Sequence, residues 1–242
     1  MLRVLPDAEW ARLAAHLVLV DMTLGQVAYE SDANVENVYF PTTSVVSMLH
    51  LMHDGTPAEI AIVGTEGLVG IALFMGGETM PGRAIVQSAG QAYSLDARIL
   101  KEEFDRAGPV QRLLLRYTQA LITQMAQTVV CNQHHSMDQQ TCRWLLLSAD
   151  RLPLNEQKMT VELIANLLGI PRAGMIEAAM KLQDAGLVRC SGNHVGVLDR
   201  PGLEKRACSR TIASPDSRAI FSTSMFTTSD CLADPPLGCA SA

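Results

Sequence analysis

The first 130 residues of the chain lack cysteine, and no two of its six cysteines form a C-x-x-C pair. This scarcity argues against a disulfide framework, a zinc ribbon or a cysteine-ligated cluster in the first half of the chain. No uninterrupted apolar run approaches the roughly 20 residues that a membrane-spanning helix needs. The opening MLRVLPDAEW carries acidic residues and lacks the basic-then-apolar order of a signal peptide. We therefore expect a cytoplasmic protein with reduced thiols and no membrane partner.

Basic residues are scarce in the first part of the chain. Residues 1–107 hold six Lys and Arg against fourteen Asp and Glu, whereas residues 138–206 hold nine against eight. Residues 108–137 hold two arginines and no acid. The net charge of −6 thus comes mainly from residues 1–107, and it does not exclude a nucleic-acid partner for the later part of the chain.

The 242 residues are enough for two domains, and the first of these has the pattern of a β domain. Short apolar or alternating runs fill residues 21–95, among them VENVYFP, SVVSMLHLM, AEIAIVG and RAIVQS. Runs of this length predict strands, and His53-Asp54-Gly55 is a hairpin signal between two of them. We predict an antiparallel sandwich or jelly roll over residues 1–107.

A long helix is predicted next, because the segment VQRLLLRYTQALITQMAQTVVCNQ continues without a break after Gly108-Pro109. Six of its residues recur at alternating steps of four and three, as in a coiled-coil seam. Since the flanking domains look self-contained, we predict that residues 108–137 pair two copies of the chain; the alternative is a core helix of a larger bundle. The predicted dimer interface is Val110, Leu114, Tyr117, Leu121, Gln124 and Thr128.

Residues 138–206 have the pattern of a winged helix-turn-helix. Helices are predicted from Thr160 to Leu168 and from Arg172 to Ala185, and Gly169 suits the end of the first helix. Two short strands then form a wing with Gly192-Asn193 at its tip. Residues 207–242 hold eleven Ser and Thr without a sustained period, and we predict a disordered tail there.

This order of parts resembles the Crp/Fnr (cyclic-AMP receptor protein / fumarate-nitrate regulator) superfamily of bacterial transcription regulators. The resemblance is carried by VYFPTTSVVSML, VGTEGLVGIALFMGG, RYTQALITQMAQTVVCNQHHS, RWLLLSADR and MTVELIANLLGIPRAGMIEAAMKLQDAGLVRCSGNHVGVLDRPGLE. It implies an α+β chain with a jelly roll of the cyclic-nucleotide-binding type, a dimerisation helix and a winged helix-turn-helix. It also implies a homodimer on a pseudo-palindromic operator in double-stranded DNA, RNA polymerase as a further partner, and no enzymatic activity.

The resemblance makes residues 172–185 the recognition helix, which would enter the major groove. Arg172 matches the family's base-contacting arginine, whose fork suits guanine, whereas Ala173 and Glu177 depart from the family's common residues. Helical spacing directs four residues inward: Met175, Ala178, Ala179 and Leu182. The residues expected toward DNA are Arg172, Ala173, Ile176, Glu177 and Lys181. Phosphate contacts are expected from Lys158, Thr160, Arg189, Asn193 and His194.

The stretch LVGIALFMGGETMPGRAIVQ corresponds to the family's phosphate cradle for a cyclic nucleotide. Gly70 and Arg83 match the glycine and arginine of that cradle, so they are the candidate effector-binding residues. Ile71 stands where a glutamate would bind the ribose, and a buried hydroxyl without an acceptor loses about 1–3 kcal/mol. We therefore predict that cyclic AMP is not the ligand, that the effector is another molecule or that the sensor is degenerate, and that the protein holds no cofactor or metal.

Two alternatives remain open. The nearly balanced charge of residues 138–206 also fits an interaction module of the same fold that binds a protein and not DNA. A cupin-like metalloenzyme could draw its ligands from His16, His50, His53 and Glu59. His50 and His53 are three apart, and residues three apart on one strand point to opposite faces. No Ser-His-Asp or P-loop pattern is present to suggest another enzyme class.

Overall fold

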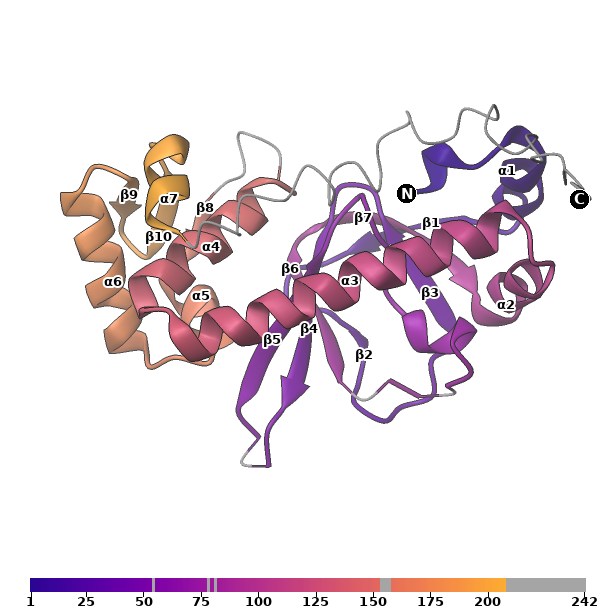
Figure 1. Cartoon of the computed structure of the whole chain (residues 1–242), viewed down its shortest axis with the longest axis horizontal. Helices are drawn as coiled ribbons and strands as arrows, with labels where there is room; N and C mark the ends of the chain where they lie inside the picture. The colour runs from indigo at the N-terminus through magenta and orange to yellow at the C-terminus, as the bar shows by residue number, and fades with distance from the viewer. Residues whose placement is uncertain (54, 78, 81, 153–157, 208–242) are drawn as a thin grey trace, which may run out of the picture.

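Figure 1 shows the computed structural model of the chain, which describes residues 1–207 except 54, 78, 81 and 153–157. Of Lys158 only the backbone is described. A long helix, α3 (Pro109–His134), runs along one side of the β-sheets, and the helices drawn in orange gather at one end of the molecule. The tail predicted to be disordered lies outside the described residues, apart from Ala207.

The described residues before α3 form two antiparallel sheets, here called the β-rich domain. Its strands are β1 (Val18–Met22), β2 (Val27–Tyr29), β3 (Asn37–Pro41), β4 (Val45–Leu51), β5 (Pro57–Val63), β6 (Arg83–Ser88) and β7 (Gly90–Asp96). Its helices are η1 (Leu2–Val4), α1 (Asp7–Ala14), η2 (Ile71–Phe74) and α2 (Ala97–Asp105). One sheet has the order β1–β7–β3 and the other β2–β6–β4–β5, which confirms the predicted antiparallel fold class.

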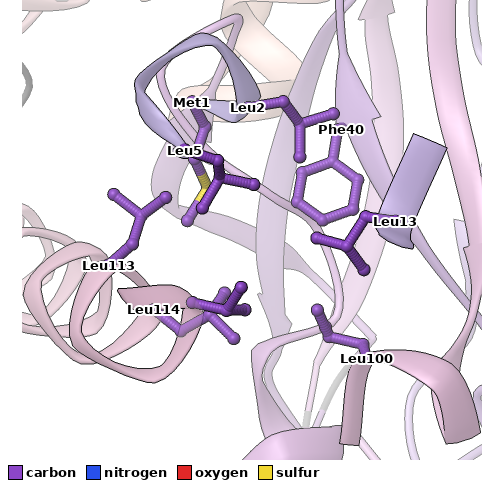
Figure 2. Close-up of a pocket in the computed structure, with 9 residues that line it drawn as sticks. Met1, Leu2, Leu5, Leu13, Phe40, Leu100, Leu113 and Leu114 are labelled. Atoms are coloured by element: carbon purple, nitrogen blue, oxygen red, sulfur yellow. The ribbon is translucent and has the colours of Figure 1, made fainter. Parts of the chain in front are cut away.

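The two sheets enclose an apolar core because alternate residues of their strands point inward. In β3, Val38 and Phe40 are buried, whereas Tyr39 between them is partly exposed. Apolar side chains from the N-terminal segment, α1, α2 and the start of α3 close one end of this core around Phe40 (Figure 2). The space among them is about 10 Å³, enough for at most one water molecule, so these described side chains leave no room for a ligand among them.

The face of α3 that was predicted to pair two copies packs against the chain's own sheets instead. Tyr117 Oη donates a 2.8 Å hydrogen bond to Leu68 O, and Gln124 Nε2 donates one of 3.2 Å to Ile62 O. Thr128 is 8% exposed. The remaining residues of the predicted seam belong to the core of the β-rich domain: Val110, Leu114 and Leu121. The predicted dimer interface is therefore wrong, because five of these side chains pack against the β-rich domain and Thr128 Oγ1 accepts a hydrogen bond from Arg143 of the following helix.

The rest of the described chain is a helical domain with a small sheet. Its elements are α4 (Met137–Ala149), β8 (Lys158–Thr160), α5 (Val161–Leu168), α6 (Arg172–Asp184), β9 (Val188–Ser191), β10 (His194–Val197) and α7 (Arg200–Arg206). A capping box of Ser136 and Gln139 starts α4. The sheet has the order β8–β10–β9, in which β9 and β10 are the predicted wing; β8 and α7 were not predicted.

The two domains share one apolar core. Val45, Leu49 and Ile62 of strands β4 and β5 pack in the same cluster as Trp144 and Leu145 of α4. The opposite faces of β4 and β5 contribute to the core inside the β-rich domain, so these two strands are buried on both sides. The expectation that the flanking domains are self-contained is therefore wrong.

A buried polar network crosses the same interface. Ser47 Oγ of β4 donates a 3.0 Å hydrogen bond to Gln87 Oε1 of β6, and Gln87 Nε2 donates one of 2.8 Å to Ser148 Oγ of α4. Nearby, Arg151 Nε lies 2.6 Å from Glu66 Oε1. Because each hydrogen bond has a required geometry, this network fixes how the helical domain sits on the sheet.

Among the described helices, none is by itself long and apolar enough to cross a membrane. Helices α5 and α6 satisfy the criteria of length and composition only as a pair, and the chain bends by 117° between them. Their apolar residues Ile164, Met175 and Leu182 are buried in the shared core.

Candidate nucleic-acid interface

Helices α5 and α6 form a helix-turn-helix whose geometry follows from local residues. Thr160 Oγ1 accepts a 3.1 Å hydrogen bond from Leu163 N and so caps the start of α5. Gly169 ends α5 with a φ of 64°, a left-handed conformation that glycine adopts without strain. Pro171 precedes α6, and the 117° bend between the helices lies within the roughly 90–120° range of this motif.

Helix α6 buries one face and exposes the other. The four residues predicted to point inward are at most 2% exposed: Met175, Ala178, Ala179 and Leu182. The five residues predicted to point outward are all exposed: Arg172, Ala173, Ile176, Glu177 and Lys181. The structure thus has the two faces that the helical spacing predicts, while contact of the outer face with DNA stays a prediction.

The charged side chains of α6 differ in whether an ion pair already occupies them. Glu177 Oε1 lies 2.9 Å from Lys181 Nζ one turn later, and this pair lowers the pKa of Glu177 and raises that of Lys181. Arg172, at the first position of the helix, is exposed and has no hydrogen-bond or ion-pair partner among the described residues. Arg172 is therefore the basic side chain of α6 that is not held by an acid.

The wing adds polar groups beside the helix-turn-helix. Three residues expected to contact phosphates are exposed there: Arg189, Asn193 and His194. Asn193 O accepts a 2.8 Å hydrogen bond from Val161 N, so the tip of the wing lies against the start of α5. Thr160 is partly buried and uses its hydroxyl in the helix cap, and the side chain of Lys158 lies outside the described residues.

Sequence reasoning missed one exposed residue of α6. Met180 is 58% exposed and lies on the side of the helix that also carries Ala173 and Ile176. The signal for it was available, because Met180 follows Ile176 by four residues and falls outside the inward-pointing set. The outer face of α6 thus has more apolar surface than predicted.

Contacts within the chain explain the two candidate effector residues without a bound effector. Gly70 has a φ of 111°, and a Cβ at this position would lie 3.0 Å from Val38 Cγ1. Arg83 Nε lies 3.0 Å from Glu30 Oε2, although not aligned for a hydrogen bond. An anionic effector at Arg83 would therefore have to displace Glu30.

The geometry does not support the metalloenzyme alternative. His50 and His53 are exposed, whereas Glu59 is buried beside Trp144 of α4. Within the part of the chain that the structure describes, no group of three or more His, Cys, Asp and Glu residues is placed to hold a metal ion. The three residues therefore do not form a ligand set.

Comparison with known proteins agrees with this arrangement. Residues 139–206 match the family of Crp-like helix-turn-helix domains. The structure of FixK2 from Bradyrhizobium japonicum has a TM-score of 0.68 at 17% identity, over 79% of this chain and 98% of that one. A CRP-family transcriptional regulator from Thermus thermophilus has a TM-score of 0.64 at 19% identity, over 78% and 96%. No curated protein sequence matches this chain.

A third similar structure is the c-di-GMP-responsive global regulator CLP of Xanthomonas campestris, with a TM-score of 0.62 at 15% identity, over 80% of this chain and all of that one. The matched residues 139–206 contain the helix-turn-helix and wing described above, so this part of the chain is a Crp-like helix-turn-helix domain. The described part of the chain has the fold of solved Crp/Fnr transcription regulators, which confirms the fold that the sequence resemblance implies.

Proposed function

We propose that the protein is a sequence-specific transcription regulator that binds double-stranded DNA as a homodimer. Residues 1–107 are its sensor domain, residues 108–137 its dimerisation helix and residues 138–206 its DNA-binding domain. The observation that carries the proposal is the exposed first turn of α6, where Arg172 has no partner among the described residues. In a helix-turn-helix the first residues of the second helix contact base edges, and an arginine fork suits guanine O6 and N7.

The proposed homodimer uses a second stripe of α3. Leu115, Ile122 and Val129 are 51%, 55% and 60% exposed and recur every seven residues, with Gln119 and Ala126 between them. An apolar repeat of seven residues is the seam of a two-stranded coiled coil. Pairing along this stripe relates the two α6 helices by a two-fold axis, so the operator is an inverted repeat with half-sites roughly 34–36 Å apart.

We further propose that cyclic AMP is not the effector. Ile71 offers no acceptor for a ribose hydroxyl, and Arg83 is already paired with Glu30. Isothermal titration of the full chain with cyclic AMP should give no binding heat, and a saturable isotherm would contradict this. The resemblance to transcription regulators also supports RNA polymerase as a protein partner.

Selection of bound sequences from a random DNA pool tests the proposed function. We expect an inverted repeat, and Arg172→Ala should relax one symmetric pair of positions, with a loss of about 1–3 kcal/mol for each base contact. Arg3→Ala, which removes an exposed arginine of the β-rich domain, is the matched control and should leave the selected sequence unchanged. Absence of DNA binding at low salt would favour the interaction module that binds a protein partner.

A further inference from the structure

An exposed apolar strip occupies the outer face of α6. It consists of Ala173, Ile176 and Met180, spaced by three and four residues and so on one side of the helix. Ile176 is 42% exposed and Met180 is 58% exposed. The strip lies between Arg172 at the start of the helix and the ion pair of Glu177 with Lys181.

Apart from Arg172, most side chains of α6 outside the strip are already engaged. Its opposite face is packed in the core shared with the β-rich domain, through Met175, Ala179 and Leu182. Glu177 is held by Lys181, which makes its carboxylate a poorer acceptor for the amino group of cytosine. We therefore expect any base contact of α6 other than the one made by Arg172 to involve the apolar strip.

The chemistry of the strip limits what it can contact on a base. The side chains of Ala173 and Ile176 have no hydrogen-bond donor or acceptor, so they cannot distinguish the polar groups of a base edge. The apolar group that a base presents in the major groove is the C5-methyl group of thymine. Ile176 lies one helical turn after Arg172, which places it over a neighbouring base.

On the basis of the proposed function, we propose that Ile176, supported by Ala173, contacts the C5-methyl group of a thymine next to the guanine contacted by Arg172. The half-site therefore requires thymine at this position because of its methyl group and not because of its hydrogen-bonding pattern. Base contacts concentrate at the start of the recognition helix. Met180 lies one turn beyond Ile176, farther from the start of α6, and is assigned no base.

The test uses the full chain and the operator recovered by selection. In both half-sites, the thymine beside the Arg172-dependent guanine is replaced by deoxyuridine, which removes the methyl group and keeps the base pairing. We expect Kd to rise roughly tenfold, equivalent to about 1.4 kcal/mol, the scale of two buried methyl groups. Deoxyuridine in place of thymines outside the half-sites should leave Kd unchanged.

Two variants complete the experiment. Ile176→Ala should bind the thymine operator more weakly and bind thymine and deoxyuridine operators equally, because the methyl group has lost its contact. Val18→Ala, which shortens a side chain of β1 that is 61% exposed, should keep the tenfold difference. A half-site without this thymine, or equal binding of both operators by the native chain, overturns the inference and leaves the proposed function standing. Failure to select any sequence overturns both.

Discussion

Among single residues, Glu59 carries a pH dependence that follows from its burial between the two domains. It is 8% exposed, beside Ser47 of β4 and Trp144 of α4, and Arg143 and Arg151 lie near it. Desolvation raises the pKa of Glu59 from 4.5 to about 8. The hydrogen bonds and positive charges of these neighbours stabilise the carboxylate, but by less than burial destabilises it. Between these two pH values the folded chain holds a proton that the unfolded chain has released.

The contribution of Glu59 to the free energy of unfolding should therefore be fully present below pH 4.5, decrease as the pH rises, and be lost above pH 8. The steepest decrease is about 1.4 kcal/mol per pH unit. Glu59→Gln should remove this decrease in the free energy of unfolding between pH 5 and 8 and should raise the urea midpoint at pH 8 above that of the native chain. Urea denaturation of both proteins from pH 5 to 9 measures this. Glu162→Gln, at an exposed carboxylate of α5, should keep the native slope; parallel profiles for Glu59→Gln and the native chain would refute the argument.

At the scale of elements, the turn between α5 and α6 also contacts the β-rich domain. A Cβ on Gly169 would lie 3.0 Å from Pro57 O of β5, whereas a Cβ on Gly192 at the wing tip would meet no atom within 4 Å. Both glycines have positive φ, 64° and 60°, so alanine strains both by about 1 kcal/mol. Gly169→Ala should destabilise the chain more than Gly192→Ala in urea denaturation, and equal losses would show that the turn does not depend on β5.

The exposed stripe of α3 makes a prediction about assembly. Ile122→Glu places a charge in the middle of the seven-residue repeat, where pairing would bury it at a cost of several kcal/mol. Light scattering should show that the molar mass falls from that of a dimer to that of a monomer. Leu24→Glu changes a side chain that is 63% exposed in the β-rich domain and should leave the dimer intact. A native chain that is already monomeric would contradict the proposed homodimer.

The helix α3 also shows where sequence reasoning fails. It carries two apolar stripes, one through Leu114 and Leu121 and another through Leu115 and Ile122, and both repeat every seven residues. Periodicity finds such stripes but does not tell which one covers the chain's own sheet and which one faces outward. Assigning the first stripe to the dimer requires a β-rich domain that is complete without α3, whereas α3 contributes Val110, Leu114 and Leu121 to the core of that domain.

For α6 the same reasoning succeeded, because that helix has a single inward stripe, in which Met175 and Leu182 are fully buried. The hydrogen-bond network of Ser47, Gln87 and Ser148 could not be predicted from the sequence. Gln87 and Ser148 are 61 positions apart, and polar residues in a strand and a helix carry no local signal that they will meet. Contacts of this kind depend on how the domains pack.

At the scale of the whole molecule, the shared core predicts that the two domains unfold together. Two tryptophans report on them separately, since Trp10 lies on α1 of the β-rich domain and Trp144 is buried in α4. Trp10→Phe and Trp144→Phe each leave one tryptophan as the fluorescence reporter. For each variant, the urea midpoint measured by fluorescence should equal the midpoint measured by circular dichroism on the same variant. A fluorescence midpoint that departs from it would show independent domains.

Strand β5 contacts both α3, which carries the stripe proposed to pair two copies, and α5 of the helix-turn-helix. A bound molecule that displaces β5 would act on both at once. Self-association and operator affinity would then be reciprocally linked: the factor by which pairing strengthens DNA binding equals the factor by which DNA strengthens pairing. Dilution alone would weaken binding to the operator, with no change in any residue that contacts a base.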